Sequence, residues 1–87
     1  MKTFDQLLAE EVAAAREEHV PINSAHEGYA VLLEEVEEFW DWVKMKRSNR
    51  VPKEMLTELV QIAAMAQRTA EDVVMPLLIK NDETENI

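Results

Sequence analysis

The chain has 87 residues, of which 47% are hydrophobic and 31% are charged, and its formal net charge is −9. A chain of this length predicts one domain with a thin core, and the composition is typical of a globular protein rather than a disordered one. The negative charge argues against a nucleic-acid polymer or an anionic membrane as partner, and the lack of cysteine excludes disulfides and thiolate metal sites.

The first residues and the distribution of apolar residues bear on location. The start, MKTFDQLLAEE, becomes acidic too early for a signal peptide. The sequence also has no run of about 18 apolar residues, the length that a membrane-spanning helix needs. We therefore expect a cytoplasmic protein that has no membrane partner.

Residues 3–18 are predicted to form the first helix. Thr3 and Gln6 match a T-x-x-Q capping box, and apolar residues recur at helical spacing from Phe4 to Ala15. The helix should end in the sequence HVPIN, because Pro21 disfavours helical geometry in the residue before it.

The second helix is predicted over residues 24–47, and it begins at the S-x-x-E box of Ser24 and Glu27. One apolar stripe about 100° wide runs along it, and a stripe of this kind normally faces a core. We therefore expect Trp40 to be a core residue. The stripe consists of Tyr29, Leu32, Leu33, Val36, Trp40 and Val43.

The third helix is predicted to begin at Pro52, since proline is favoured at the first helical position. Pro76 should break or kink it near Met75, and the following PLLIK is expected to form a short C-terminal helix before a flexible acidic tail over residues 81–87. The alanines on the apolar face of the third helix would allow another helix to approach closely. That face consists of Met55, Leu59, Ile62, Ala63, Ala66, Ala70 and Val73.

Glutamates gather on the second helix in the stretch LLEEVEEFWDW. Glu34, Glu35 and Glu38 share one side of the helix, and like charges four residues apart repel each other. Val31 and Trp42 fall on the same side, which is unusual for a simple solvated face. We therefore expect this second surface to face another helix, a subunit or a ligand.

The third helix offers a matching polar row of Glu54, Glu58 and Gln61. A short connector favours antiparallel neighbours, so the polar rows of the two helices can meet and surround a hard cation. Mg²⁺ is the best candidate, with Mn²⁺ as a second option, because these ions prefer oxygen ligands. The pattern alone leaves open the alternative that the acids form an ordinary solvated face.

The stretch HEGYAVLLEEVEEFWDWVK, followed by EMLTELVQIAAMAQRTAEDV, resembles the MazG-like all-α nucleoside triphosphate pyrophosphohydrolases over about residues 24–73. The family motif is E-E-x-x-E on one helix and E-x-x-D on the next. Glu34, Glu35 and Glu38 match the first half, and Glu58 and Gln61 occupy the second half as ELVQ. Gln61 departs from the family aspartate. It offers a neutral oxygen, so a second ion should bind more weakly.

The resemblance implies a magnesium-dependent enzyme that cleaves a nucleoside triphosphate into a monophosphate and pyrophosphate, for cleaning of the nucleotide pool. It also implies a single MazG-like helical domain over residues 1–80, completed by assembly into a homodimer or homotetramer. Glu35 and Glu38 would be the catalytic residues. The implied metal ligands are Glu34, Glu35, Glu38, Glu58 and Gln61.

Three residues near the end of the second helix are candidates for binding the nucleotide. Trp42 is suited to stacking on the base, and Lys44 and Arg47 are suited to the phosphates. A subunit contact for Trp42 and a complement to the helix dipole for the two basic residues are the alternatives. The rival function is a non-catalytic helical binding or regulatory module that retains the fold, which Gln61 leaves open.

Overall fold

The chain folds into three main helices, and the computed structural model describes residues 1–79. The elements are α1 (Phe4–Glu18), α2 (Ala25–Lys44), a short 3₁₀ turn (Arg47–Asn49), α3 (Pro52–Thr69) and a π-helical turn (Ala70–Val74). The predicted all-α class is confirmed for this part of the chain. The predicted tail, residues 81–87, lies outside the described residues.

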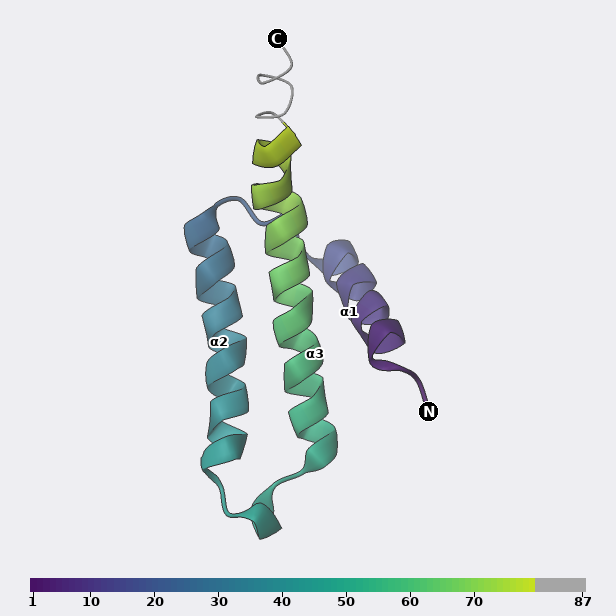
Figure 1. Ribbon diagram of the computed structural model, residues 1–87, viewed down its shortest axis with the longest axis vertical. Coiled ribbons are helices and arrows are strands. Elements are labelled where there is room, and N and C mark those ends of the chain that lie inside the picture. The colour runs from purple at the N-terminus through teal and green to yellow at the C-terminus, as the bar shows by residue number, and fades with distance from the viewer. Residues whose placement is uncertain (80–87) are drawn as a thin grey trace.

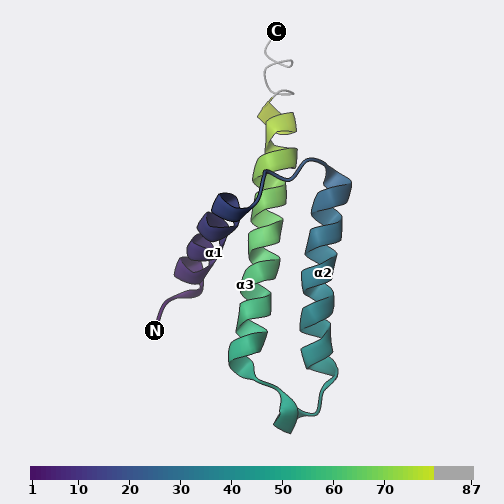
Figure 2. The same ribbon diagram turned by 180° about the vertical axis from the view of Figure 1, so that it is seen from behind.

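The hairpin of α2 and α3 is the frame of the molecule. The two helices run antiparallel, and α1 lies along another side of α3, as Figure 1 and the reverse view in Figure 2 show. Both α1 and α2 therefore depend on α3 for their packing. None of the helices within residues 1–79 has the length and apolar character that crossing a membrane requires.

Side-chain caps form the predicted starts of α1 and α2. The Gln6 N–H donates to Thr3 Oγ1 at 3.2 Å and the Thr3 N–H donates to the Gln6 side chain at 2.8 Å, which completes the capping box. At α2, the Glu27 N–H donates to Ser24 Oγ at 3.1 Å, but the Glu27 carboxylate accepts from the Asn23 N–H instead of that of Ser24. The second box is therefore half formed.

The helix continues past Pro76, where we predicted a break or a kink. The turn Ala70–Val74 is π-helical, with the Met75 N–H donating to the Ala70 carbonyl, and residues 75–79 are again α-helical. A proline ring clashes with the carbonyl four residues earlier in a regular α-helix, and one wider turn relieves this clash. The short C-terminal helix is therefore continuous with α3 through this turn.

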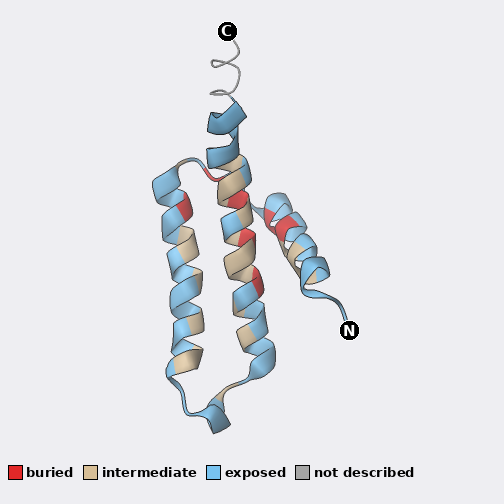
Figure 3. Ribbon diagram, in the orientation of Figure 1, coloured by how far each residue is buried: buried red, intermediate tan, exposed pale blue. Residues whose placement is uncertain are grey.

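The core of the described residues is small and lies mainly between α1 and α3. Figure 3 shows the buried positions of α3 on the side turned toward α1. No large side chain among the described residues is fully buried. The buried hydrophobic residues are Val12, Ala15, Ile22, Val60 and Ala64.

The helix α2 turns toward α3 a side that includes Gly28 and Glu35 and only part of the predicted apolar stripe. Gly28 is buried, whereas Trp40 is 54% exposed. The half-buried residues of α2 are Val31, Leu32, Glu35, Phe39, Trp42 and Val43. The prediction that Trp40 is a core residue is therefore wrong for the single chain. The prediction that the second surface faces another helix is confirmed. The reason is that the side with Gly28 allows the closer approach of the two helices.

Gly28 sets the spacing between α2 and α3. A Cβ atom at this position would lie 2.5 Å from Thr69 Cγ2 and 2.6 Å from Thr69 Oγ1. Thr69 cannot easily turn away, because its hydroxyl donates to the Met65 carbonyl at 2.8 Å. The absence of a side chain at residue 28 is therefore a condition of this helix contact.

We expect Gly28→Ala to lower the free energy of unfolding by about 1–3 kcal/mol, the usual cost of overpacking. Without the clash, alanine would favour the helix by about 1 kcal/mol. Urea denaturation followed by circular dichroism measures the difference. In a Thr69→Ala background, which removes both of the nearest atoms, Gly28→Ala should cost much less. A Gly28→Ala protein as stable as the wild type would contradict the close contact.

Candidate metal centre

Three glutamates from two helices converge between α2 and α3. Glu35 and Glu38 are three residues apart on one side of α2, and Glu58 reaches them from the antiparallel α3. One carboxylate oxygen from each of the three lies within 4.8 Å of the others. The structure therefore brings together three of the five predicted metal ligands.

Two of these carboxylates are partly removed from water. Glu35 and Glu58 are half-buried and Glu38 is exposed. Glu35 Oε2 and Glu58 Oε2 are buried and accept no hydrogen bond. A buried acceptor without a donor costs about 1–3 kcal/mol, so the cluster is unfavourable as three bare carboxylates. A cation or a shared proton would offset this cost.

Glu35 and Glu58 hold protons more tightly than isolated glutamates do, because the pKa of each is raised. Burial raises the pKa of Glu35 to about 7, and the neighbouring charges of Glu38 and Glu58 act in the same direction. Burial also raises the pKa of Glu58, and Glu38 adds to this effect. The protonation of Glu35 and of Glu58 therefore depends on the charge of the neighbouring carboxylates.

Glu34 and Gln61 lie beside the cluster rather than within it. Glu34 is exposed and Gln61 is half-buried. Both line, together with Glu35, a cavity of about 670 Å³ that is bordered by all three helices. Gln61 follows Glu58 by three residues, so its amide lies about one turn further along α3. Their assignment as metal ligands stays a prediction.

The cavity combines acidic and apolar walls. Glu11 and Glu18 of α1 line it together with glutamates of α2, while Val31, Ile22 and Met65 supply apolar surface. Its volume falls in the range of about 300–1,000 Å³ that is typical of small-molecule sites. Because most of the charged groups at its wall are negative, a polyanionic ligand would need a cation to enter.

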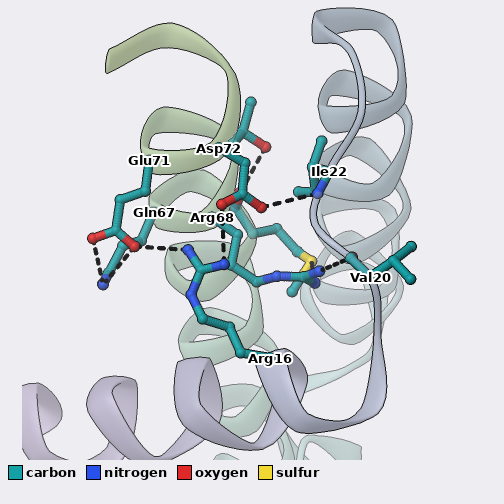
Figure 4. A network of polar contacts seen from close by, with 9 residues as sticks. Arg16, Val20, Ile22, Gln67, Arg68, Glu71 and Asp72 are labelled. Carbon is teal, nitrogen blue, oxygen red and sulfur yellow. Dashed lines mark hydrogen bonds and ion pairs between the residues drawn. The ribbon is translucent and has the colours of Figure 1, made fainter. Parts of the chain in front are cut away.

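Sequence reasoning missed Arg68, which lines the same cavity. Arg68 is 5% exposed, and its guanidinium donates to the Val20 carbonyl at 3.3 Å (Figure 4). The contact ties the connector between α1 and α2 to α3. The only sequence feature that could have placed Arg68 near the site is its spacing from Gln61. Arg68 follows Gln61 by seven residues and so lies on a similar side of the helix.

Asp72 anchors the same connector from the π-helical turn. It accepts from the Ile22 N–H at 2.9 Å and from Arg16 of α1 at 3.0 Å (Figure 4). Burial alone would raise the pKa of Asp72, but the Ile22 hydrogen bond and the Arg16 guanidinium outweigh it and hold the pKa below its ordinary value. The carboxylate thus stays ionised and holds in place the connector, whose Ile22 lines the cavity.

The three predicted substrate-binding residues lie at the other end of α2. Trp42 is half-buried, and Lys44 forms an ion pair with Asp41 at 3.0 Å. Arg47 is exposed at the start of the 3₁₀ turn. Trp42, Lys44 and Arg47 do not line the cavity beside the cluster. Their role in nucleotide binding stays a prediction.

Comparisons of the chain with protein-family models, with curated proteins and with solved structures found no match. The resemblance to the MazG-like family therefore stays an expectation from the sequence. The functional assignment therefore rests on the geometry of the glutamate cluster.

Ionisation of the cluster should destabilise the metal-free protein. The pKa of Glu35 in the folded chain, about 7, lies above its ordinary value of 4.5, so the folded state binds more protons between these values. The resulting stability is fully present below the lower value and is lost as the pH rises through about 7. We expect Glu35→Gln to raise the melting temperature in EDTA at pH 8, with a smaller gain at pH 5.

Glu37→Gln is the matched control, because Glu37 is exposed on the same helix and lies outside the cluster. Its effect on the melting temperature should be similar at the two pH values. A gain for Glu35→Gln that does not change with pH would contradict the raised pKa of Glu35.

Proposed function

We propose that this chain hydrolyses a nucleoside triphosphate to a monophosphate and pyrophosphate with Mg²⁺ or Mn²⁺, as a step in cleaning the nucleotide pool. The observation that carries the proposal is the convergence of Glu35, Glu38 and Glu58 within 4.8 Å, with two buried carboxylate oxygens that lack a donor. No ion pair within residues 1–79 neutralises any of the three. An oxygen-liganded divalent cation fits this donor set.

The residues can be given separate roles in this reaction. Glu35 and Glu58, whose buried oxygens lack donors, are suited to hold the ion, and Glu34 and Gln61 are close enough along the helices to complete its ligands directly or through water. Glu38 is the exposed member, and together with Glu35 it is suited to orient the attacking water and accept its proton. Bound Mg²⁺ supplies charge neutralisation and a lower pKa for that water.

The bonds that change are defined by the products. The water oxygen forms a bond to the α-phosphorus, and the bond from this phosphorus to the oxygen bridging to the β-phosphate breaks. Pyrophosphate leaves with the electron pair, and the proton of the water passes to a carboxylate of the cluster. No covalent intermediate with the protein is needed.

The cavity beside the cluster supports a substrate of nucleotide size. Glu35 belongs both to the cluster and to the wall of the cavity, so a ligand held by phosphate at the cluster can extend into about 670 Å³ of space. The acidic wall would repel a free triphosphate and accept one that carries a divalent cation. Trp42, Lys44 and Arg47 remain candidates for contacts at the other end of the substrate.

We also propose a MazG-like helical domain that acts in the cytoplasm and self-associates as a homodimer or homotetramer. The antiparallel pairing of the E-E-x-x-E helix with the ELVQ helix supports the family assignment. The small core supports association. A second candidate, a non-catalytic regulatory module, is favoured by Gln61, because this residue removes one negative charge from the motif.

Glu38→Gln is expected to reduce pyrophosphate release by at least about 100-fold, the usual scale for losing a general base. The assay uses a panel of ribo- and deoxynucleoside triphosphates without metal, with Mg²⁺ and with Mn²⁺. The helical signal should be unchanged, and Glu37→Gln should retain the wild-type rate. Full activity of Glu38→Gln would contradict the assignment, and no release by the wild type with either metal would favour the regulatory module.

Gln61→Asp tests the missing charge of the motif. An additional carboxylate beside the cluster should lower the Mg²⁺ concentration for half-maximal pyrophosphate release, by about tenfold if it adds roughly 1.4 kcal/mol to ion binding. Gln61→Asn is the matched control, since it has the same length as aspartate without the charge. Equal Mg²⁺ dependence of Gln61→Asp and Gln61→Asn would show that residue 61 does not influence the ion.

A further inference from the structure

A buried arginine lies at the end of the cavity that is farther from the glutamate cluster. Arg68 of α3 is 5% exposed, and it lines the cavity together with Val20 and Ile22 of the connector between α1 and α2. It follows Glu58 by ten residues, so the two Cα atoms are roughly 15 Å apart along the helix. The cavity thus runs from the carboxylate of Glu35 at one end to a guanidinium at the other.

The guanidinium of Arg68 has few partners. Arginine has five N–H donors and no acceptor. Its Nη2 donates to the Val20 carbonyl at 3.3 Å (Figure 4), and its Nη1 donates weakly to the sulfur of Met65 at 3.7 Å. The Nε–H is buried and has no acceptor among the described residues. A buried donor without an acceptor costs free energy, so a ligand atom that accepts a hydrogen bond is favoured here.

The positive charge of Arg68 is also left without a direct partner. No carboxylate within residues 1–79 forms an ion pair with it. Asp72 follows Arg68 by one turn, but its two oxygens already accept from the Arg16 guanidinium and from the Ile22 N–H. A buried cation is normally paired. The charge of Arg68 is therefore available to an electron-rich atom in the cavity.

The Val20 carbonyl adds an acceptor beside these donors. A carbonyl oxygen has two lone pairs, and in the described chain this one accepts a single hydrogen bond, from Arg68. A donor and an acceptor therefore lie side by side at this end of the cavity. Val31, Ile22 and Met65 supply apolar wall to the same cavity. Polar groups that meet the edge of a ring, combined with apolar walls against its faces, are typical of a pocket for a nucleobase.

We propose that Arg68 and the Val20 carbonyl read the base of the nucleotide and select bases in which a carbonyl lies next to a ring N–H, as in guanine, hypoxanthine and uracil. The base carbonyl accepts from the free N–H groups of Arg68, and the ring N–H donates to the second lone pair of the Val20 oxygen. Adenine and cytosine carry an amino group next to a ring nitrogen that has no hydrogen. They would set donor against donor and acceptor against acceptor.

The distance from the cluster explains why the base, and not a phosphate, meets Arg68. The inference rests on the proposed function, in which the phosphates are held at the cluster through a divalent cation. Arg68 lies nearly three turns of α3 further along. Glu27 and Glu34 line the wall on the α2 side, and they would repel a phosphate without its cation, whereas a base is neutral. This arrangement leaves Trp42, beyond the cluster, to the pyrophosphate end of the substrate.

Calorimetric titration tests the selection in the presence of Mg²⁺. The probes are nucleotides in which a methylene group replaces the oxygen between the α- and β-phosphates, so the measurement needs no turnover. Hypoxanthine with adenine, and uracil with cytosine, are matched pairs that differ at the edge that is read. The wild type should bind the hypoxanthine and uracil compounds about tenfold more tightly than their partners, or more.

Two variants test the role of Arg68. Arg68→Met removes the donors and keeps the length of the side chain, and the affinity ratio within each pair should fall to about one. Arg68→Lys keeps the charge without the planar fork and should give an intermediate ratio, which decides the matter if circular dichroism shows that Arg68→Met is unfolded. Arg16→Met is the matched control, because Arg16 belongs to the same polar network and does not line the cavity. It should keep the wild-type ratio.

The outcomes separate base selection from hydrolysis. A ratio near one in the wild type, or a wild-type ratio in folded Arg68→Met, overturns the selection. An equal loss of affinity for all four bases in Arg68→Met would place a phosphate at Arg68 and would also overturn it. A tenfold ratio that depends on Arg68, in a protein that releases no pyrophosphate, would support the selection and reject the hydrolysis.

Discussion

The contact between α2 and α3 includes carboxylates from both helices, and the other features of the structure depend on how these groups are brought together. Gly28 allows the two helices to approach, and the approach brings Glu35, Glu38 and Glu58 together. Three negative groups at a helix contact oppose folding unless something neutralises them. Most of the apolar stripe of α2 is exposed as a result, namely Tyr29, Leu33, Val36 and Trp40. The chain therefore has two unsatisfied surfaces, one polar and one apolar.

These two surfaces call for different partners. The polar one lies next to a cavity that is partly lined by the connector between α1 and α2. Hydrogen bonds to Arg68 and Asp72 hold this connector in place. The apolar one, formed by Tyr29, Leu33, Val36 and Trp40, lies on the flank of α2 away from the residues that line the cavity. A cation at the first and a second chain at the second would act on separate faces, and the hairpin would be stabilised from both directions.

Much of the fold could be predicted because its signals are local. The caps at Thr3 and Ser24 and the proline at residue 52 define helix starts through contacts within one turn. The meeting of Glu35, Glu38 and Glu58 also followed from spacing plus an antiparallel hairpin. The spacing of residues could not predict which side of α2 faces α3, because apolar residues occur on both sides of this helix. Arg68 and Asp72 were missed because their partners are about 50 residues away in the sequence.

The raised pKa of Glu35 links the cluster to the acidity of its surroundings. A carboxyl that is half protonated near pH 7 must release its proton before it can coordinate an ion. Binding of a divalent cation would thus release a proton from Glu35. Mild acidification would weaken the hold on the ion, and alkaline conditions would strengthen it. If the cluster holds a metal ion, Glu35 would in this way also make its affinity for the ion depend on pH near 7.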